Sequence, residues 1–275
     1  MHRERRKEGK NVTECIDIDL VANAGVLVRG GGLGLLVDGV HDEGGHPFSR
    51  VGPDTVARMV RGEGVFADLD YLLFTHEHPD HFTPKLTLEL LRRRPVRGVL
   101  LPDAAQGSSE LARFTDALVE MGVPHWPLGL APGCVRRVEP EPGLAVTAVG
   151  ARHMGPKFRG VRNDCLLVTL DGMNLLFTGD ADHVPEYYED ALRDVDIDAV
   201  FVNPIFYHNP DGQAVINDTF RPREVFIYHM PPKDDDPFHL VFTVKRALER
   251  HARPDMPVRV LDADNAAARL CRAGT

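Results

Sequence analysis

Residues 75–81 read Thr-His-Glu-His-Pro-Asp-His, so three histidines and one aspartate fall within one short loop. The apolar segment before the loop, Tyr71–Thr75, has the composition of a buried strand. The segment after it, Pro84–Arg94, begins with proline and has leucines at helical spacing, which predicts a helix. A position at the end of a buried strand disfavours a merely solvated histidine loop and favours a functional site at the edge of a sheet.

The four polar side chains of this loop have the spacing of metal ligands. Side chains alternate along an extended chain, so His76 and His78 project to the same side and can share one ion. Asp80 and His81 lie where the chain turns into the predicted helix and can reach a second ion. All four are nitrogen or oxygen donors, which suit zinc, iron or manganese.

Further donors are needed to complete two metal sites, and three candidates each follow a predicted apolar strand: His153, Asp180 and His229. A single histidine at a strand end is more often a surface residue than a ligand. We nevertheless expect these three to converge with residues 76–81, because all of them terminate strands that can share one sheet edge.

The pattern along the chain predicts two sheets packed face to face with helices outside, because strands come in hairpins first and alternate with helices later, in each half. Residues 30–32, all glycine, predict a hairpin turn, since no phosphate-loop context surrounds them. Asp171-Gly172 is a second hairpin signal. The predicted strands are Ile16–Leu20, Gly25–Val28, Gly34–Val37, Tyr71–Thr75, Val96–Leu101, Leu144–Ala151, Cys165–Leu170, Met173–Thr178, Ala199–Val202, Glu224–Tyr228 and Val258–Leu261. The predicted helices are Pro53–Arg61, Pro84–Arg94, Ser108–Met121, Pro185–Arg193, one near Gln213–Phe220, and Pro237–His251.

Composition favours a globular protein in one domain spanning residues 1–275, with residues 1–10 as a flexible tail. Hydrophobic residues make up 43% of the 275, and the net charge is −9, which argues against a nucleic-acid surface. The basic N-terminus lacks the apolar core of a signal peptide, and no apolar run approaches the ~20 residues of a membrane span. We therefore expect a cytoplasmic enzyme without a membrane partner. Its oligomeric state stays open.

The four cysteines show neither a zinc-binding nor a disulfide pattern, because they are scattered and form no Cys-x-x-Cys pair. The prediction is that they are reduced and pack as small hydrophobic side chains. They are Cys15, Cys134, Cys165 and Cys271.

The order of the donors resembles the metallo-β-lactamase superfamily. That family has the pattern HxHxDH, then a histidine, then an aspartate in a Thr/Ser-Gly-Asp turn, then a final histidine, and the chain matches it from about Ile16 to Leu261. The resemblance implies an α+β fold, an αββα four-layer sandwich of two mixed β-sheets flanked by helices. It also implies that Asp38 supports the metal-binding loop. The ligands that it implies are His76, His78 and His153 for one metal, Asp80, His81 and His229 for the other, and Asp180 for both.

A metal-dependent hydrolase follows from the resemblance, with two divalent ions, expected to be zinc, or else manganese or iron. Two such ions about 3.5–4 Å apart lower the pKa of a water and present hydroxide to the substrate. Asp80, or an incoming water, could return a proton to the leaving group, and Asp180 would fix the metal spacing. The expected substrate is a small ester, lactone or phosphodiester.

The chain is most similar to the small cytoplasmic branch that includes the ascorbate-6-phosphate lactonase type. Three cations in the loop Met154–Asn163, namely Lys157, Arg159 and Arg162, suggest an anionic substrate. A solvated basic loop is the alternative. Likewise, His208 is a candidate for orienting the substrate or assisting the leaving group, or else an ordinary loop residue.

Residues 41–48 read as a mobile loop that could cover the site. His41, His46 and His183 are candidates for the rim of the pocket. An iron-dependent redox enzyme of the sulfur dioxygenase type is the alternative to the hydrolase.

Overall fold

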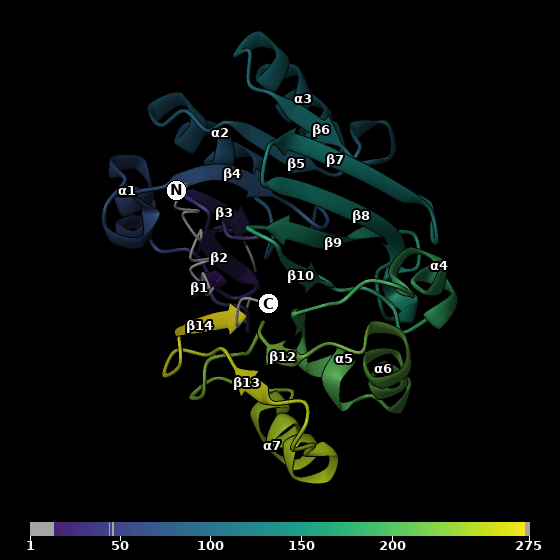
Figure 1. The fold of residues 1–275 in the computed structure, drawn as a ribbon. Helices are drawn as coiled ribbons and strands as arrows, with labels where there is room; N and C mark the ends of the chain where they lie inside the picture. The colour runs from purple at the N-terminus through teal and green to yellow at the C-terminus, as the bar shows by residue number, and fades with distance from the viewer. Residues whose placement is uncertain (1–13, 44, 46, 273–275) are drawn as a thin grey trace, which may run out of the picture.

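The computed structural model describes residues 14–43, 45 and 47–272, and in it two seven-stranded mixed sheets pack face to face (Figure 1). Three helices cover the outer face of the first sheet, and the later helices cover the outer face of the second. The αββα arrangement predicted from the sequence is confirmed.

The first sheet has the order β14-β1-β2-β3-β4-β5-β6. Pairing is antiparallel from β14 to β3 and parallel from β3 to β6. The three-glycine segment forms the β2–β3 hairpin turn as predicted, with Gly31 and Gly32 at positive φ. The strands are β1 Glu14–Ala22, β2 Gly25–Gly30, β3 Leu33–Val37, β4 Leu69–Leu73, β5 Gly98–Leu101, β6 His125–Pro127 and β14 Ala267–Arg272.

The second sheet has the order β13-β12-β11-β10-β9-β8-β7 and repeats this design. Hairpins connect the consecutive strands from β7 to β10, which are antiparallel neighbours. The strands from β10 to β13 run parallel. Parallel neighbours need a crossover connection, and the later helices lie in these connections. Asp171 and Gly172 have φ values of 48° and 78°, as a two-residue hairpin turn requires. The strands are β7 Val135–Glu141, β8 Leu144–Arg152, β9 Arg162–Leu170, β10 Met173–Phe177, β11 Ala199–Val202, β12 Glu224–Ile227 and β13 Val258–Val260.

The helices divide between the two sheets. Ser108 caps α3 by accepting a hydrogen bond from the backbone of Leu111. The first three helices are α1 Pro53–Arg61, α2 Pro84–Arg93 and α3 Ser109–Glu120, and the later ones are α4 Glu189–Leu192, α5 Pro204–His208, α6 Pro210–Ala214, the π-helix Val215–Phe220 and α7 Leu240–His251. Short 3-10 turns occur at Gly64–Phe66, Ala104–Gln106, Pro156–Phe158 and Pro185–Tyr187.

Alternation along the strands builds three apolar layers. Leu73 of β4 points between the sheets and joins Phe177 and Phe201 of the second sheet there, whereas its neighbour Leu72 packs under α1–α3. Val200 of β11 packs in the same way under the later helices. The core between the sheets fixes the two sheets relative to each other. The ends of β4, β8, β10 and β12 therefore lie close together at one edge of the sandwich.

Three strands at sheet edges, β6, β7 and β14, were not predicted.

Two predicted helices have other bounds in the structure. The segment Pro185–Arg193 divides into a 3-10 turn and α4. Helix α7 begins only at Leu240, because the carboxylate of Asp236 accepts hydrogen bonds from the backbone N–H groups of Leu240 and Val241.

A disulfide bond joins Cys15 of β1 to Cys271 of β14, so the prediction that all four cysteines are reduced is wrong for this pair. The two residues face each other in the antiparallel register, with Cα atoms 4.2 Å apart. Sequence spacing could not reveal the pair, because 256 positions separate it and it depends on the unexpected strand β14. Cys134 and Cys165 are free, exposed and buried respectively.

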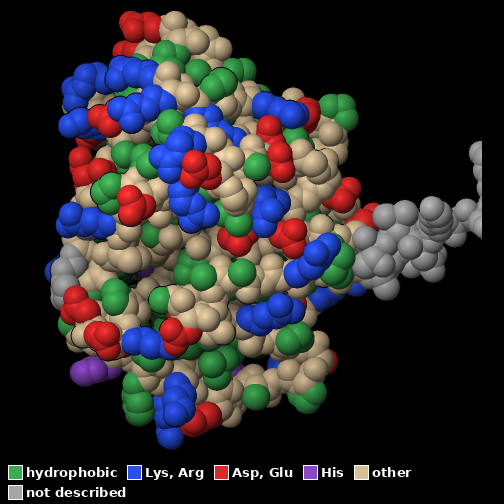
Figure 2. All heavy atoms as spheres, turned by 90° about the vertical axis from the view of Figure 1, so that its left-hand side faces the viewer, with side chains coloured by type: hydrophobic (Ala, Val, Ile, Leu, Met, Phe, Trp, Pro, Cys, Tyr) green, Lys and Arg blue, Asp and Glu red, His purple; other side chains and the backbone are tan. Residues whose placement is uncertain are grey.

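Two surface properties accompany this fold. Figure 2 shows that the face that looks left in Figure 1 carries basic and acidic side chains interspersed with hydrophobic ones. Among the residues that the structure describes, no helix has both the length and the apolar character needed to cross a membrane.

Candidate metal centre

Asp38 contacts two residues of the loop Thr75–His81 through its carboxylate. It follows β3, which is parallel to β4, so its side chain lies beside the residues that leave β4. Its Oδ1 accepts a hydrogen bond from the backbone of Thr75 at 2.8 Å, and its Oδ2 accepts from the Thr75 hydroxyl at 2.6 Å. The same Oδ2 lies 3.0 Å from Nδ1 of His81. Asp38 is fully buried, and these contacts are the supporting role that the resemblance implied.

All seven predicted ligands converge. The structure forms three groups in which the donor atoms lie within 4.8 Å of one another. The groups are His76, His78 and His153; His76, His81 and Asp180; and Asp80, His81 and His229.

Asp180 lies between the two outer groups. Its Oδ2 is 3.2 Å from Nε2 of His153 and 3.7 Å from Nε2 of His81, while its Oδ1 is 3.9 Å from Nε2 of His229. One carboxylate therefore contacts histidines of both groups, which is the position that a bridging ligand needs.

The turn that carries Asp180 is tightly built. Gly179 has a φ of 55°, and a Cβ there would lie 2.6 Å from both Asn163 Oδ1 and Thr75 Oγ1. The backbone of Asp180 donates to Asn163 Oδ1 at 2.9 Å, and Asn203 Nδ2 donates to Asp180 Oδ1 at 3.0 Å. Sequence reasoning missed both asparagines, because an isolated asparagine carries no motif.

The histidine rings are oriented as a metal site requires. Nδ1 of His153 donates to the carbonyl of Met154 at 2.7 Å, and Nδ1 of His76 lies 3.0 Å from the Thr75 hydroxyl. Nε2 of His76 is buried and has no hydrogen-bond partner among the described residues, and Nε2 of His153 is buried with the Asp180 carboxylate at 3.2 Å. A buried imidazole nitrogen held in this way is the usual state of a metal ligand.

A cation would also resolve a close approach in the second group. Nε2 of His81 lies 3.2 Å from Nε2 of His229, and Asp80 Oδ2 lies 3.3 Å from the same His229 atom. Nδ1 of His81 is engaged by Asp38, so its Nε2 presents a lone pair when the ring is neutral. Two lone pairs at this distance repel each other unless a proton or a metal ion lies between the two nitrogens. The seven residues therefore fit divalent metal ions.

The pKa shifts of His76, His78 and Asp180 agree with this fit, whereas burial of His81 is outweighed by Asp180 and Asp38, which raise the pKa of that ring well above its usual value. Burial lowers the pKa of His76 well below its usual value and that of His78 to about 4, which keeps both rings neutral at pH 7. Burial acts to raise the pKa of Asp180, but the charges of His229 and His81 outweigh it and hold the pKa well below its usual range. Neutral imidazoles and ionised carboxylates are the metal-binding forms.

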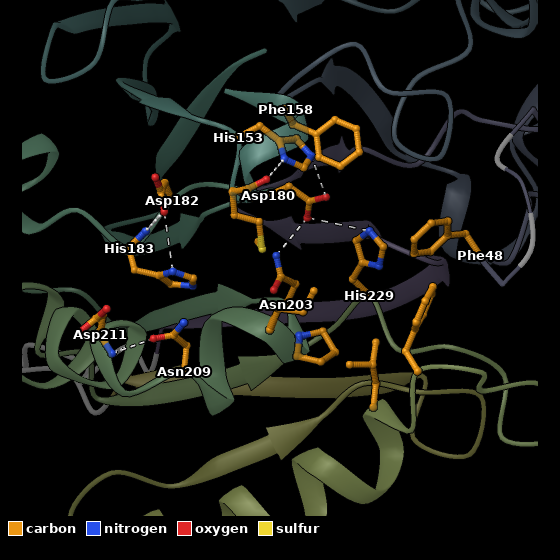
Figure 3. Close-up of a pocket in the computed structure, with 16 residues that line it drawn as sticks. Phe48, His153, Phe158, Asp180, Asp182, His183, Asn203, Asn209, Asp211 and His229 are labelled. Carbon is orange, nitrogen blue, oxygen red and sulfur yellow. Dashed lines mark hydrogen bonds and ion pairs between the residues drawn. The ribbon is translucent and has the colours of Figure 1, made fainter. Parts of the chain in front are cut away.

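A cavity of about 680 Å³ opens beside the cluster (Figure 3). Its lining comprises Phe48, His153, Met154, Gly155, Phe158, Asp180, Asp182, His183, Asn203, Pro204, Ile205, Asn209, Asp211, His229, Phe238 and Leu240. Asp80 is absent from this lining. Asp180 is therefore better placed than Asp80 to meet a substrate.

The structure places His208 outside the cluster and outside the lining of the main cavity, and its catalytic role stays a prediction. It ends α5, where its Nδ1 lies 3.2 Å from the carbonyl of Pro204, and it lines a separate cavity against α7. Of the predicted rim histidines, His183 lines the main cavity, His41 is fully buried and is not part of the lining, and His46 lies outside the described residues.

The basic loop also differs from the expectation. Lys157 and Arg159 are exposed, and neither lines the cavity. The Arg162 guanidinium donates to the carbonyl of Gly129 and lines a different, smaller cavity. From this loop, only Met154, Gly155 and Phe158 face the main cavity.

Comparison with known proteins places the chain in a family. Residues 35–255 match the model of the beta-lactamase superfamily domain. No curated protein gives a significant match.

Solved structures match the fold at low sequence identity. The metallo-beta-lactamase fold protein YhfI from Bacillus subtilis is 13% identical, with a TM-score of 0.60 over 94% of this chain and 100% of that one. Igni18, a metallo hydrolase from Ignicoccus hospitalis, is 15% identical, with a TM-score of 0.57 over 95% and 100%. CmlA, a diiron beta-hydroxylase from Streptomyces venezuelae, is 19% identical, with a TM-score of 0.57 over 94% of this chain but only 54% of that one. The family match over most of the chain, together with this fold and a His/Asp cluster that fits metal ions, shows that the protein belongs to the beta-lactamase superfamily and has the metallo-β-lactamase fold.

Proposed function

We propose that the protein is a dinuclear metal-dependent hydrolase of small ester-like substrates. The observation that carries the proposal is the position of Asp180 between the two histidine groups, at the wall of the large cavity. His76, His78 and His153 would hold one ion, Asp80, His81 and His229 the other, and Asp180 both. Zinc suits this nitrogen and oxygen donor set, as do manganese and iron.

The residues have separate tasks in such a reaction. Two divalent ions, when bound, would activate water and polarise the scissile carbonyl or phosphoryl oxygen. Asp180 reaches the cavity and would fix the spacing of the two ions, while Asp80 is held by Asn23 and His229, so an incoming water would return the proton to the leaving group. Phe48 and Phe158 pack against the rings of His229 and His153 and give the site an apolar wall.

Elemental analysis of purified protein and a substrate panel test this function. We expect two divalent ions per chain and hydrolysis of at least one ester, lactone, thioester or phosphodiester. His78→Ala should lower metal content and abolish turnover, whereas His125→Ala, a change of a half-buried histidine in β6, should alter neither. A metal-loaded protein without activity on the panel would contradict the proposal.

Iron-dependent oxidation is the second candidate, because CmlA, a diiron beta-hydroxylase, has a similar fold and the donor set here suits iron equally. Stoichiometric iron with oxygen consumption, and no hydrolysis, would favour it. The ascorbate-6-phosphate lactonase type and a cytoplasmic location stay predictions. A phosphorylated substrate of that type would meet carboxylates, and no lysine or arginine, in the described lining of the cavity.

A further inference from the structure

The lining of the main cavity differs in charge from what the basic loop suggested. Among the described residues that line it, none is lysine or arginine, and three are aspartates. Asp180 belongs to the metal cluster, but Asp182 and Asp211 do not. In Figure 3, these two carboxylates lie with His183 on one side of Asp180, while Phe48 lies on the other. An anionic substrate group directed toward them would be repelled.

The rest of the wall is largely apolar. Aromatic rings approach the candidate ligands directly: Phe48 is 5.0 Å from His229, and Phe158 is 4.7 Å from His153, between ring centroids. Phe158, Ile205 and Phe238 are 42%, 43% and 62% exposed. Large apolar side chains left exposed around a cavity are typical of a surface that a ligand covers.

His183 lies at the remote end of the cavity with one ring nitrogen buried. Its side chain is only 11% exposed, and its Nε2 is buried without a hydrogen-bond partner in the described part of the chain. Its ring packs on Phe206 at 4.7 Å, and its Nδ1 lies 3.8 Å from Asp182 Oδ1. Because that nitrogen is shielded from the cavity as well as from water, the polar groups that this end presents to a ligand are the carboxylates of Asp182 and Asp211.

From this lining we infer that the substrate has an apolar body and carries, away from the scissile bond, a neutral or cationic hydrogen-bonding group and no anionic one. The scissile group would lie at Asp180, the apolar body against Phe158 and Ile205, and the remote group near Asp182 and Asp211. This inference rests on the proposed hydrolase function and names the substrate class of the same site.

Three matched 4-nitrophenyl esters test it, the hexanoate, the 6-aminohexanoate and the adipate monoester, which differ only at the chain end. Initial rates on the metal-loaded protein should give the highest kcat/KM for the 6-aminohexanoate and a value at least tenfold lower than the other two for the adipate, through KM. Asp211→Lys should reverse the order of the aminohexanoate and adipate esters. Lys157→Ala, which changes an exposed residue outside the lining, should leave all three values unchanged. Adipate turnover equal to or above the others, or a drop confined to adipate in Lys157→Ala, would overturn the inference.

Binding of analogues separates this inference from the hydrolase proposal. Ketones in which CH₂ replaces the ester oxygen cannot be hydrolysed, and calorimetry on the metal-loaded protein gives their Kd. The same order of affinity, with the carboxylate weakest by tenfold or more, supports the substrate class even if no ester is turned over. If the analogues bind in this order but no ester is turned over, only the hydrolase proposal is contradicted. If the three affinities are equal, or if the carboxylate analogue binds most tightly, the inferred substrate class is contradicted.

Discussion

The side-chain amide of Asn23 donates a hydrogen bond to the backbone carbonyl of Asp80 at 2.9 Å, and lies 3.3 Å from its carboxylate. Asn23 belongs to the β1–β2 turn, where it has a φ of 49° and is buried. Its own carbonyl accepts a hydrogen bond from the backbone of His229 at 3.2 Å. One residue of an N-terminal hairpin thus positions two ligands of the second group, which come from opposite sheets.

Replacement of Asn23 by alanine should weaken the second metal site selectively. Loss of a contact that orients metal ligands typically costs about 10–100-fold in affinity. Asn23→Ala should therefore lower the affinity for the weaker ion by this factor and leave the stronger one nearly unchanged, in a titration with a chromophoric chelator. Asn217→Ala, a half-buried asparagine of the π-helix, is the matched control. Equal weakening of both sites would contradict a positioning role.

Removal of the Asp38 carboxylate should destabilise the metal-free protein. Asp38→Ala leaves the Thr75 backbone, the Thr75 hydroxyl and His81 Nδ1 without their buried partner. We expect a loss of about 3–5 kcal/mol in the free energy of unfolding, from urea titration with a chelator present. Asp19→Ala, which breaks the more exposed pair with Arg29, should cost under ~1 kcal/mol. A similar loss in both variants would be inconsistent with this account.

Asp164 should give stability a pH dependence of defined sign. Burial raises its pKa from 3.8 to about 6, although the backbone N–H groups of Leu130 and Gly129 act against the shift. Since the folded protein binds this proton more tightly than the unfolded chain, the stability it contributes is complete below pH 3.8 and is lost as pH rises to about 6. The free energy of unfolding of the wild type, minus that of Asp164→Asn, should decrease as the pH rises over this range. A difference that stays constant from pH 4 to 7 would exclude the shift.

Reduction of the Cys15–Cys271 bond should lower stability by about 2–5 kcal/mol, measured by urea unfolding with and without dithiothreitol. The double variant Cys15→Ser, Cys271→Ser should show the reduced stability without the reagent and no further response to it. Cys134→Ser, at an exposed free cysteine, should respond to the reagent as the wild type does. An unaltered midpoint on reduction would argue against the bond.

Much of the site follows from the sequence because its donors terminate apolar strands. The β-strand before His76 and the short turn around Asp180 are local patterns, and both are found, the strand at Leu69–Leu73, two residues earlier than predicted. Helix α1 even has the predicted bounds, since Pro53 starts it and Gly62, with a φ of 63°, ends it.

What the sequence did not reveal depends on distant contacts. The unexpected strands β6, β7 and β14 all lie at sheet edges, where alternation is weak; β7 is mostly exposed and includes Pro140. Whether a charge faces a cavity is also a tertiary property. Lys157 follows His153 closely in the sequence, yet it lies outside the lining, while Asp211, far along the chain, is part of it.

The covalent link between β1 and β14 also affects how the protein associates with other chains. Strand β14 is the last strand of its sheet and pairs with no other strand than β1 in the described structure. If the thiols were reduced, a detached β14 would leave the backbone groups of β1 open to pairing with a neighbouring molecule. The link therefore keeps β14 over the edge of β1, and reduction that releases β14 should appear as dimers and larger species in size-exclusion chromatography.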